Sequence, residues 1–345
     1  MPDDNPSALA PALAVSEGVF QLPEDLPLHH GGVLARPEIA WRLPGGATQP
    51  VVVVLGGISA SRMVFGHEDS RRGWWNEVVG PGRALDASRV RILGIDYLGG
   101  SGSSTRPRSG APFPSLSSFD QARSLVALLD HLGIPRLRAI VGASYGGMVA
   151  LAFGQRYATR VERLVVISAA DCAHPMATAW RSVQRAIVRF GIRVGHAGEG
   201  MELARALAMS TYRSPEEFAA RFRAPPRLDG SSPVFPVEEY LYARGRDYAA
   251  RYLPESFVCL SESIDLHAVD APRIAVRTDV MAVREDQLVP VGDMRALAAR
   301  LPDARLHEFS SLHGHDAFLK EAEQLKPVLA TVAGETERAE ENDLD

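Results

Sequence analysis

Cysteine is scarce in this sequence, which contains only Cys172 and Cys259 among 345 residues. The two lie far apart, and neither belongs to a metal-binding or redox motif. A fold held together by a network of disulfides is therefore not indicated. The histidines do not suggest a metal either, because none has a metal-ligand spacing to another histidine or to a cysteine. We expect no metal site.

Long apolar runs are also missing. The run Val51–Leu55 is typical of those present, and its length suits a strand and is far too short for a membrane-spanning helix. The N-terminal residues include acidic side chains and prolines where a secretion signal would be basic. The sequence therefore predicts no membrane partner and favours a cytoplasmic location.

Positive charge is not in excess. Lysine and arginine total 37 against 42 aspartates and glutamates, which gives a formal net charge of −5 with no basic face. Nucleic acid is therefore not an expected partner. Apolar residues, in contrast, make up 46% of the chain. That share, at this length, suits one large α/β domain with an insertion, or two domains, with a large core.

Strand-like and helix-like segments alternate through the first half of the chain. Runs rich in β-branched residues at Val51–Leu55, 90–95 and 161–168 predict strands that are buried on both faces. Residues 118–132 have the apolar spacing of an amphipathic helix, and Gly133 follows as a typical helix end. This alternation is typical of a mostly parallel sheet with helices on both faces.

The pattern changes after residue 170. Residues 171–268 are helical in period and rich in arginine and aromatic residues, without a buried strand. We expect them to form a helical lid inserted into an α/β core. The remaining expected divisions are a disordered N-terminus at 1–18, the first part of the core at 19–170, its second part at 269–333, and an acidic tail at 334–345.

Residues 142–146 read Gly-Ala-Ser-Tyr-Gly and lie between an apolar run and a helix-compatible segment. This is the G-x-S-x-G pattern in the strand–turn–helix context that it requires. Gly142 and Gly146 allow strand and helix to approach closely while Ser144 occupies a sharp, strained turn. The pattern predicts that Ser144 is a nucleophile raised above the sheet edge. The alternative is a glycine-rich turn whose serine only caps the helix.

Two backbone segments are expected to stabilise an oxyanion. The N–H of Tyr145 points to the place where an oxyanion would form next to Ser144. In α/β-hydrolase folds the second donor comes from the loop after an early strand, which makes the N–H of Gly57 or Ile58 the candidate. These glycines would otherwise suggest a phosphate-binding loop, but no Gly-Lys-Ser/Thr sequence follows them.

A serine nucleophile needs a base and an orienting carboxylate, which follow it in the order acid, then histidine, in this fold. Asp286 lies in the loop after the expected strand 273–278, and His315 lies in the loop after Ala304–Phe309. Both loops are expected at the carboxyl ends of late strands, where such sheets place their sites. We therefore expect a triad of Ser144, Asp286 and His315. The rival candidates are Asp279 and Glu285 for the acid and His313 for the base.

These residues predict acyl transfer through a covalent acyl-serine. The base takes the serine proton, the carboxylate holds the imidazole tautomer, and the backbone N–H groups hold the oxyanion. The residues alone do not say whether water or an alcohol collects the acyl group. An esterase or thioesterase therefore remains an alternative. A non-catalytic binding module is disfavoured because all three triad residues are present.

Several longer segments occur in a fixed order, namely GWWNEVVGPGRALD, DYLGGSGSS, LLDHLGI, VGASYGGMVAL, RVERLVVISAA, STYRSPEEFAARF, FPVEEYLYARGRDYAARY and HGHDAFL. From about Trp74 to Leu319 the chain resembles the homoserine O-acyltransferase family in its α/β-hydrolase form. The resemblance is specific, because GWW with GPG, TYRS and GHDAFL have no general reason to occur in esterases.

The resemblance implies a ping-pong reaction of methionine biosynthesis. An acyl group passes from acyl-CoA, a co-substrate used without any further cofactor, through Ser144 to the hydroxyl of L-homoserine. It also implies that Arg213 binds the homoserine carboxylate, a task that suits a planar guanidinium, and that Asp316 binds the ammonium. A solvated lid arginine is the alternative for Arg213. A homodimer formed through the lid helices is implied as well.

The choice of acyl group stays open. Leu288 stands two places after Asp286, where family members that use succinyl-CoA often have arginine, and this favours acetyl. Arg62, near the oxyanion loop, would supply a cation for the succinyl carboxylate, and this favours succinyl. The loop after the first core strand also departs from the family's usual His-Ala-Leu-Thr-Gly type. Serine as the acceptor is open too.

Overall fold

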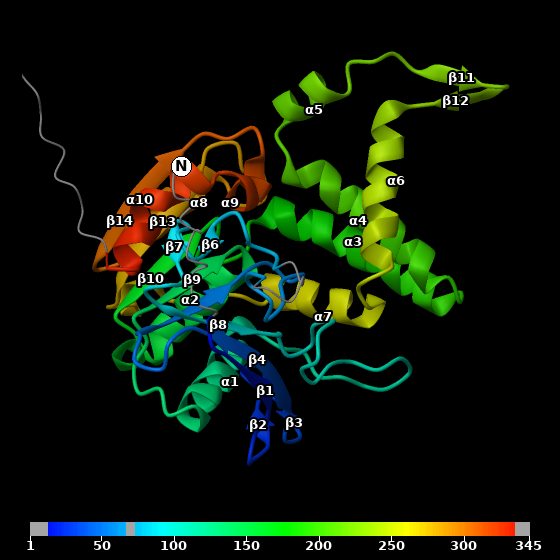
Figure 1. The fold of residues 1–345 in the computed structure, drawn as a ribbon. Helices are drawn as coiled ribbons and strands as arrows, with labels where there is room; N and C mark the ends of the chain where they lie inside the picture. Colours follow the sequence, from blue (N-terminus) through cyan, green and yellow to red (C-terminus); the bar gives the residue numbers. More distant parts are fainter. Residues whose placement is uncertain (1–12, 67–72, 335–345) are drawn as a thin grey trace, which may run out of the picture.

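The computed structural model describes residues 13–66 and 73–334, and an eight-stranded sheet forms its centre (Figure 1). The six strands from β8 to β14 in this sheet are parallel, and β4 and β1 extend one edge antiparallel. In spatial order the strands are β1 (Val15–Gln21), β4 (Glu38–Pro44), β8 (Arg91–Ile95), β5 (Val51–Leu55), β9 (Ala139–Ala143), β10 (Arg163–Ile167), β13 (Arg277–Val283) and β14 (Ala304–Phe309).

The continuous apolar run of β5 is buried on both faces, as its sequence predicts. Val53 and Leu55 belong to one hydrophobic cluster, whereas Val52 and Val54 belong to a second cluster on the other face. This division follows from the strand period of two residues. The α/β-hydrolase fold expected from the sequence is confirmed.

Helices cover both faces of the sheet. The first cluster includes apolar residues of α1 (Ser118–His131), α2 (Tyr145–Arg156) and α8 (Val291–Arg300). The second includes those of α9 (Ala317–Lys320) and α10 (Ala322–Val332). The remaining short elements are β2 (Leu26–Pro27), β3 (Val33–Leu34), β6 (Val79–Gly80), β7 (Leu85–Asp86) and the 3-10 turns Ala158–Arg160, Ala271–Arg273 and Gly314–Asp316.

A helical lid is inserted between β10 and β13 and stands apart from the sheet in Figure 1. It has its own small core around Val188, Met201 and Phe257. Its elements are α3 (Pro175–Arg193), α4 (Ala197–Tyr212), α5 (Pro215–Arg221), β11 (Arg227–Asp229), β12 (Ser232–Val234), α6 (Pro236–Ala249) and α7 (Pro254–Asp265). The β11–β12 hairpin was not expected, because its exposed residues show no apolar alternation.

The predicted disorder of residues 1–18 is wrong for its last four residues. Strand β1 begins at Val15, which pairs with Pro44 of β4. Because β1 is a largely exposed edge strand, its sequence carries little of the apolar signal that marks the inner strands. Residues 1–12 and the predicted acidic tail at 335–345 lie outside the described residues.

The parallel strands bring four loops to one edge of the sheet, below the lid. The loops after β5, β9, β13 and β14 contain Gly57, Ser144, Asp286 and His315 respectively. Adjacent parallel strands end at the same edge, so residues far apart in the sequence meet there. Within residues 13–66 and 73–334, no helix is both long and apolar enough to cross a membrane.

Candidate active site

Ser144 occupies a strained turn between β9 and α2. Its φ of 54° and ψ of −123° lie in a region that side-chain-bearing residues rarely adopt. A Cβ added at Gly142 would lie 2.2 Å from the Gly146 carbonyl oxygen, and one added at Gly146 would lie 2.3 Å from that of Leu55. Both glycines are therefore required by close backbone contact. The Ser144 side chain makes no capping hydrogen bond, which argues against the capping alternative.

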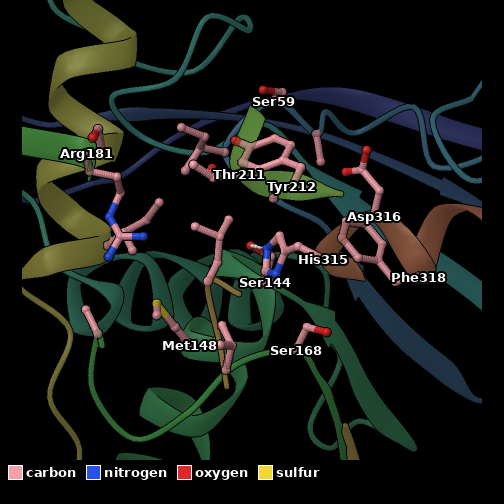
Figure 2. Close-up of a pocket in the computed structure, with 18 of the residues that line it drawn as sticks. Ser59, Ser144, Met148, Ser168, Arg181, Thr211, Tyr212, His315, Asp316 and Phe318 are labelled. Carbon is pink, nitrogen blue, oxygen red and sulfur yellow. Dashed lines mark hydrogen bonds between the residues drawn. The ribbon is translucent and has the colours of Figure 1, made fainter. Parts of the chain in front are cut away.

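The structure brings Ser144, His315 and Asp286 into one hydrogen-bonded chain. The Ser144 Oγ lies 2.9 Å from His315 Nε2 (Figure 2), and on the other side of the ring His315 Nδ1 lies 2.7 Å from Asp286 Oδ2. The second oxygen of Asp286 accepts the N–H groups of Leu288 and Val289, at 2.9 and 3.0 Å. With the carboxylate held in this way, Nδ1 carries the hydrogen and the Nε2 lone pair faces the serine hydroxyl.

The surroundings of His315 act on its basicity in opposite directions. Burial lowers the pKa most strongly, but the charge and hydrogen bond of Asp286, with the charge of Asp316, outweigh it and raise the pKa above 6.5. A higher pKa makes the imidazole a stronger base. It also means that acylation of Ser144 speeds up as pH rises through this pKa, because only the neutral ring can accept the serine proton.

The rival acids, Asp279 and Glu285, are hydrogen-bonded to groups outside the triad. Asp279 lies within β13, where it accepts hydrogen bonds from Arg163 Nε at 2.5 Å and His307 Nε2 at 2.9 Å. Burial alone would raise the pKa of Asp279, but these two partners lower it below its ordinary value. Glu285 accepts the backbone N–H of Ser311 at 2.8 Å. Neither carboxylate is bonded to His315.

The rival base, His313, is hydrogen-bonded to groups outside the triad. The Nδ1 of His313 accepts a hydrogen bond from Arg213 at 2.8 Å, and its backbone N–H donates to Ser311 Oγ. His315, in contrast, is the histidine that bonds to Ser144. The geometry thus brings together the three residues expected from the sequence.

The expected oxyanion donors surround Ser144. A Cβ added at Gly57 would lie 3.9 Å from the Ser144 Oγ, and Gly57 and Ile58 both line the cavity in front of it. Tyr145 begins α2, directly after the nucleophile, and its hydroxyl lies 2.5 Å from Ser263 Oγ. The tyrosine ring is therefore buried, and its backbone N–H remains the expected first donor to the oxyanion.

A cavity of about 240 Å³ lies above Ser144 and His315, between the core and the lid (Figure 2). Its exposed lining is more apolar than polar. The core contributes Gly57, Ile58, Met148, Leu288 and Phe318, and the lid contributes Arg181, Gln184, Arg205, Tyr212, Tyr252 and Phe257. The arrangement exposes the nucleophile to a small molecule that enters from the lid side.

Arg213 forms an ion pair with Asp316, which lines this cavity. The Nε of Arg213 donates to Asp316 Oδ2 at 3.0 Å, and the arginine side chain is only 11% exposed. Asp316 lines the cavity of Ser144, and together with Arg205 and Arg213 it also lines a neighbouring pocket of about 340 Å³. Arg213 is therefore not the solvated lid arginine of the alternative interpretation.

The two residues expected to influence the acyl group have different positions. Leu288 lines the cavity next to the triad. The expectation that Arg62 supplies a cation for the acyl group is wrong. Its guanidinium and its backbone N–H both bind the buried Asp96, and it is not among the described residues that line the cavity. The cations that do line the cavity are Arg181 and Arg205, on lid helices whose orientation the sequence does not reveal.

The described residues were also compared with the needs of a metal site and of a reactive thiol. Across the described ranges, 13–66 and 73–334, no three histidine, cysteine or acidic side chains are grouped to hold a metal. Cys172 and Cys259 are both free thiols. Burial raises the pKa of Cys259 to about 12, so this thiol stays protonated at neutral pH.

Replacing Asp286 and Asp279 separately should distinguish the acid of the triad from a structural carboxylate. We expect Asp286→Asn to slow acylation of Ser144 by p-nitrophenyl acetate by roughly 10⁴-fold, because the amide favours the wrong imidazole tautomer. Its pH profile should move to lower pH, since Asp286 raises the pKa of His315. Burst kinetics at several pH values measure both effects.

The matched control is Asp279→Asn. This change should leave the acylation rate intact but lower the free energy of unfolding by about 3 kcal/mol, because Arg163 keeps a half-buried charge without its partner. Chemical denaturation measures this loss. Equal loss of acylation in the two folded variants would contradict the assignment.

Comparison with known proteins identifies the family of the chain. The family model for the alpha/beta hydrolase fold matches residues 50–322. The homoserine O-succinyltransferase of Xanthomonas campestris pv. campestris is 43% identical over 317 residues, which cover 90% of this chain and 84% of the relative. The homoserine O-acetyltransferase of Thermus thermophilus is 37% identical over 294 residues, with 79% and 74% covered.

A solved structure supports the same fold. The X-ray crystal structure of homoserine O-acetyltransferase from Bacillus anthracis matches with a TM-score of 0.81, covering 94% of this chain and 98% of that chain. At 19% identity this likeness bears on the fold alone. The sequence relatives carry the family assignment, and the chain belongs to the homoserine O-acyltransferase family of α/β-hydrolase-fold acyltransferases.

Proposed function

We propose that this protein transfers an acyl group from acyl-CoA to the hydroxyl of L-homoserine, in methionine biosynthesis, by a ping-pong mechanism without a further cofactor. The observation that carries the proposal is the chain from Ser144 through His315 to Asp286, at the base of a cavity that is also lined by Asp316, the ion-pair partner of Arg213. The chain supplies the chemistry of acyl transfer, and the Arg213–Asp316 pair supplies two charges opposite to those of an amino acid.

In the first half-reaction, His315 Nε2 takes the Ser144 proton as Oγ attacks the thioester carbonyl. The oxyanion that forms is held by the N–H groups of Tyr145 and of Gly57 or Ile58. The C–S bond then breaks, and His315 returns the proton to the leaving CoA thiolate. Asp286 keeps the ring in the required tautomer and stabilises it while it is charged.

In the second half-reaction, the homoserine hydroxyl takes the place of the thiol. His315 accepts the hydroxyl proton as the oxygen attacks the acyl-serine carbonyl, and the same N–H groups hold the second oxyanion. The Ser144 Oγ then leaves and regains its proton from His315. Acyl-homoserine is released, and the enzyme returns to its starting state.

Arg213 and Asp316 are suited to hold homoserine during this step. A guanidinium has five N–H donors, and Arg213 uses one on Asp316 and one on His313, while its Nη1 also lies 3.5 Å from a Glu217 carboxylate oxygen. The remaining donors suit the homoserine carboxylate, and Asp316 suits its ammonium. Recognition of both charged groups would fix the direction in which the hydroxyl side chain points, so that it reaches the acyl-serine.

We further propose that the donor is succinyl-CoA. A succinyl group ends in a carboxylate that needs a cation, and Arg181 and Arg205 both line the cavity. Arg181 is paired with Asp265, whereas Arg205 faces the rings of Tyr212 and Tyr248 and forms no ion pair with a carboxylate in the described part of the chain. The relative that is 43% identical is named a homoserine O-succinyltransferase. Leu288 favours acetyl instead, because family members that use succinyl-CoA often have arginine at this place.

The first test pairs succinyl-CoA and acetyl-CoA with L-homoserine, L-serine or no acceptor and follows release of the CoA thiol. We expect release to require homoserine and to be faster with succinyl-CoA. Ser144→Ala should abolish release and the acyl adduct seen by intact-protein mass spectrometry, whereas Ser182→Ala, an exposed serine of α3, should change neither. Release without any acceptor would identify a thioesterase instead, and faster release with acetyl-CoA would overturn the succinyl assignment.

Arg213→Ala should affect the two half-reactions unequally. Loss of a charged hydrogen bond to the homoserine carboxylate should weaken use of homoserine by roughly 10- to 100-fold. Formation of the acyl-enzyme should change little, because the acyl donor does not need this contact. Single-turnover measurements with each substrate separate the steps, and Arg221→Ala, at a half-exposed arginine of α5, is the control. Equal losses in both steps would contradict the assigned role.

We also propose that the protein is a homodimer formed through the lid. Met176, Val183 and Phe190 are each more than half exposed and are spaced by seven residues on α3, so they form one apolar face. Apolar surface of this kind marks an interface, and twofold symmetric dimers are the commonest oligomers.

The dimer proposal can be tested in solution. Light scattering should give a dimer for the native chain and a monomer for the double variant Val183→Glu with Phe190→Glu, because burying two carboxylates in an apolar interface is costly. Val33→Glu, at an exposed position of the core strand β3, should stay dimeric. A monomeric native chain would disprove the proposal.

A further inference from the structure

Two tyrosines of the lid bind the loop that follows β5. The Tyr248 hydroxyl lies 3.0 Å from Ser59 Oγ, and the Tyr252 hydroxyl donates to the Ser59 carbonyl oxygen, also at 3.0 Å. Tyr248 lies on α6 and Tyr252 in the turn after it. Ser59 directly follows Gly57 and Ile58, whose N–H groups are the proposed oxyanion donors. The lid therefore touches the loop one residue away from these donors.

The core and the lid both anchor this loop, and beyond Ser59 the core holds it again, where the Arg62 N–H donates to Asp96. At the core end, the Gly56 carbonyl accepts the N–H of Gly146 at 2.9 Å and the Tyr97 hydroxyl at 2.7 Å. At the lid end, Ser59 is held by the two tyrosines. Between these anchors, the Ile58 side chain packs against both the core cluster and the lid cluster. The position of the two donors thus depends on both anchors.

The tyrosines are well ordered for this task. Their rings stack with centroids 4.2 Å apart, and Arg205 lies 4.5 Å above the Tyr248 ring. Burial raises the pKa of Tyr248 to about 12, so its hydroxyl keeps its proton at neutral pH. Ser59 contributes both a side-chain and a main-chain oxygen to the contact, so its orientation is fixed as well as its position.

The contact continues toward the base of the triad. Arg205 donates to the Tyr212 hydroxyl at 3.2 Å and lies 5.0 Å from the Tyr212 ring, whose centroid is 5.9 Å from that of His315. Figure 2 shows Ser59 and Tyr212 on the lid side of the cavity, opposite Ser144. One row of lid side chains therefore borders the oxyanion loop at one end and the imidazole at the other.

We propose that Tyr248 and Tyr252 are positioning residues that hold the N–H groups of Gly57 and Ile58 in place for the oxyanion. The proposal rests on acyl transfer through Ser144, as described above. Oxyanion donors act because they are fixed before charge develops, and losing one such donor costs about 10²- to 10³-fold in kcat. A loop without its lid contacts would keep its donors but lose part of their alignment.

If Tyr248 and Tyr252 position the oxyanion donors, their loss should change the kinetics in a way that loss of a purely stabilising residue would not. Both half-reactions form an oxyanion on the same carbonyl carbon, so misplaced donors should slow both steps to a similar extent. The KM for homoserine should change little, because neither tyrosine contacts Arg213 or Asp316. A residue that only stabilised the fold would lower the melting temperature without changing kcat in the folded enzyme.

The test uses Tyr248→Phe, Tyr252→Phe and the double variant. Phenylalanine keeps the ring stacking and the contact with Arg205 but removes the hydroxyl. We expect each single change to slow acylation and deacylation about tenfold, and the double change more, with a KM for homoserine within about twofold of the native value. Tyr242→Phe, at an exposed tyrosine of α6, should match the native enzyme.

A double-mutant cycle adds a second readout. Ser59→Ala removes the side-chain partner of Tyr248 but leaves the carbonyl partner of Tyr252. Ser59→Ala should therefore be as slow as Tyr248→Phe, and combining the two should add little further loss. Combining Ser59→Ala with Tyr252→Phe should give a larger loss than either change alone.

An alkyl fluorophosphonate separates this proposal from the proposed function. It is attacked by the Ser144 Oγ with loss of fluoride, and its P–O group occupies the oxyanion site whatever the natural donor or acceptor. Slower labelling of the tyrosine variants would support the positioning role even if homoserine proved not to be the acceptor. Native labelling and transfer rates in every variant, or a rise confined to the KM for homoserine, would overturn it.

Discussion

The site depends on how closely two strands and one helix approach each other around Ser144. The contacts of Gly142 with Gly146, and of Gly146 with Leu55, leave no room for a side chain at either glycine. This close packing holds Ser144 at a positive φ, which would cost free energy in an isolated turn and is maintained only because the surrounding sheet is rigid. The same packing places Tyr145 at the start of α2. The nucleophile and the proposed first oxyanion donor thus depend on one steric constraint in the core.

The remaining groups come from two layers that differ in what they can supply. The core contributes His315 and Asp286 at neighbouring strand ends, where the parallel sheet sets their separation. The lid contributes the two arginines of the cavity, Arg181 and Arg205, and, through Ser59, contacts the loop of the proposed second oxyanion donor. The two layers meet tightly near the base, because a Cβ added at Gly314 would lie 2.7 Å from the Tyr212 carbonyl oxygen. Any movement of the end of α4 would therefore reach the loop of His315.

The sequence predicted the core of the site well, because its signals are local. The spacing of the two glycines and the order of serine, acid and histidine follow from the chain itself. Asp279 remained a rival of Asp286 because sequence alone does not locate the end of β13; in the structure Asp279 lies inside that strand and faces Arg163 and His307. The contacts of Arg62, Arg205 and Tyr248 could not be predicted from the sequence, for another reason. Their partners are distant in the sequence, and which way a lid helix turns its side chains depends on packing between elements.

The separation of catalytic groups in the core from binding groups in the lid also explains how one core can serve both hydrolysis and transfer. The triad and the oxyanion donors treat water and an alcohol alike, since either can lose a proton to His315 and attack the same carbonyl. A preference for homoserine must therefore come from groups that bind the rest of that molecule, which is the role proposed above for the paired charges of Arg213 and Asp316. Helix α4 ends at Tyr212, directly before Arg213, and Asp316 follows the base directly, so this ion pair joins lid and core beside the triad. With the proposed roles, acceptor recognition and alignment of the oxyanion loop are coupled through the same lid.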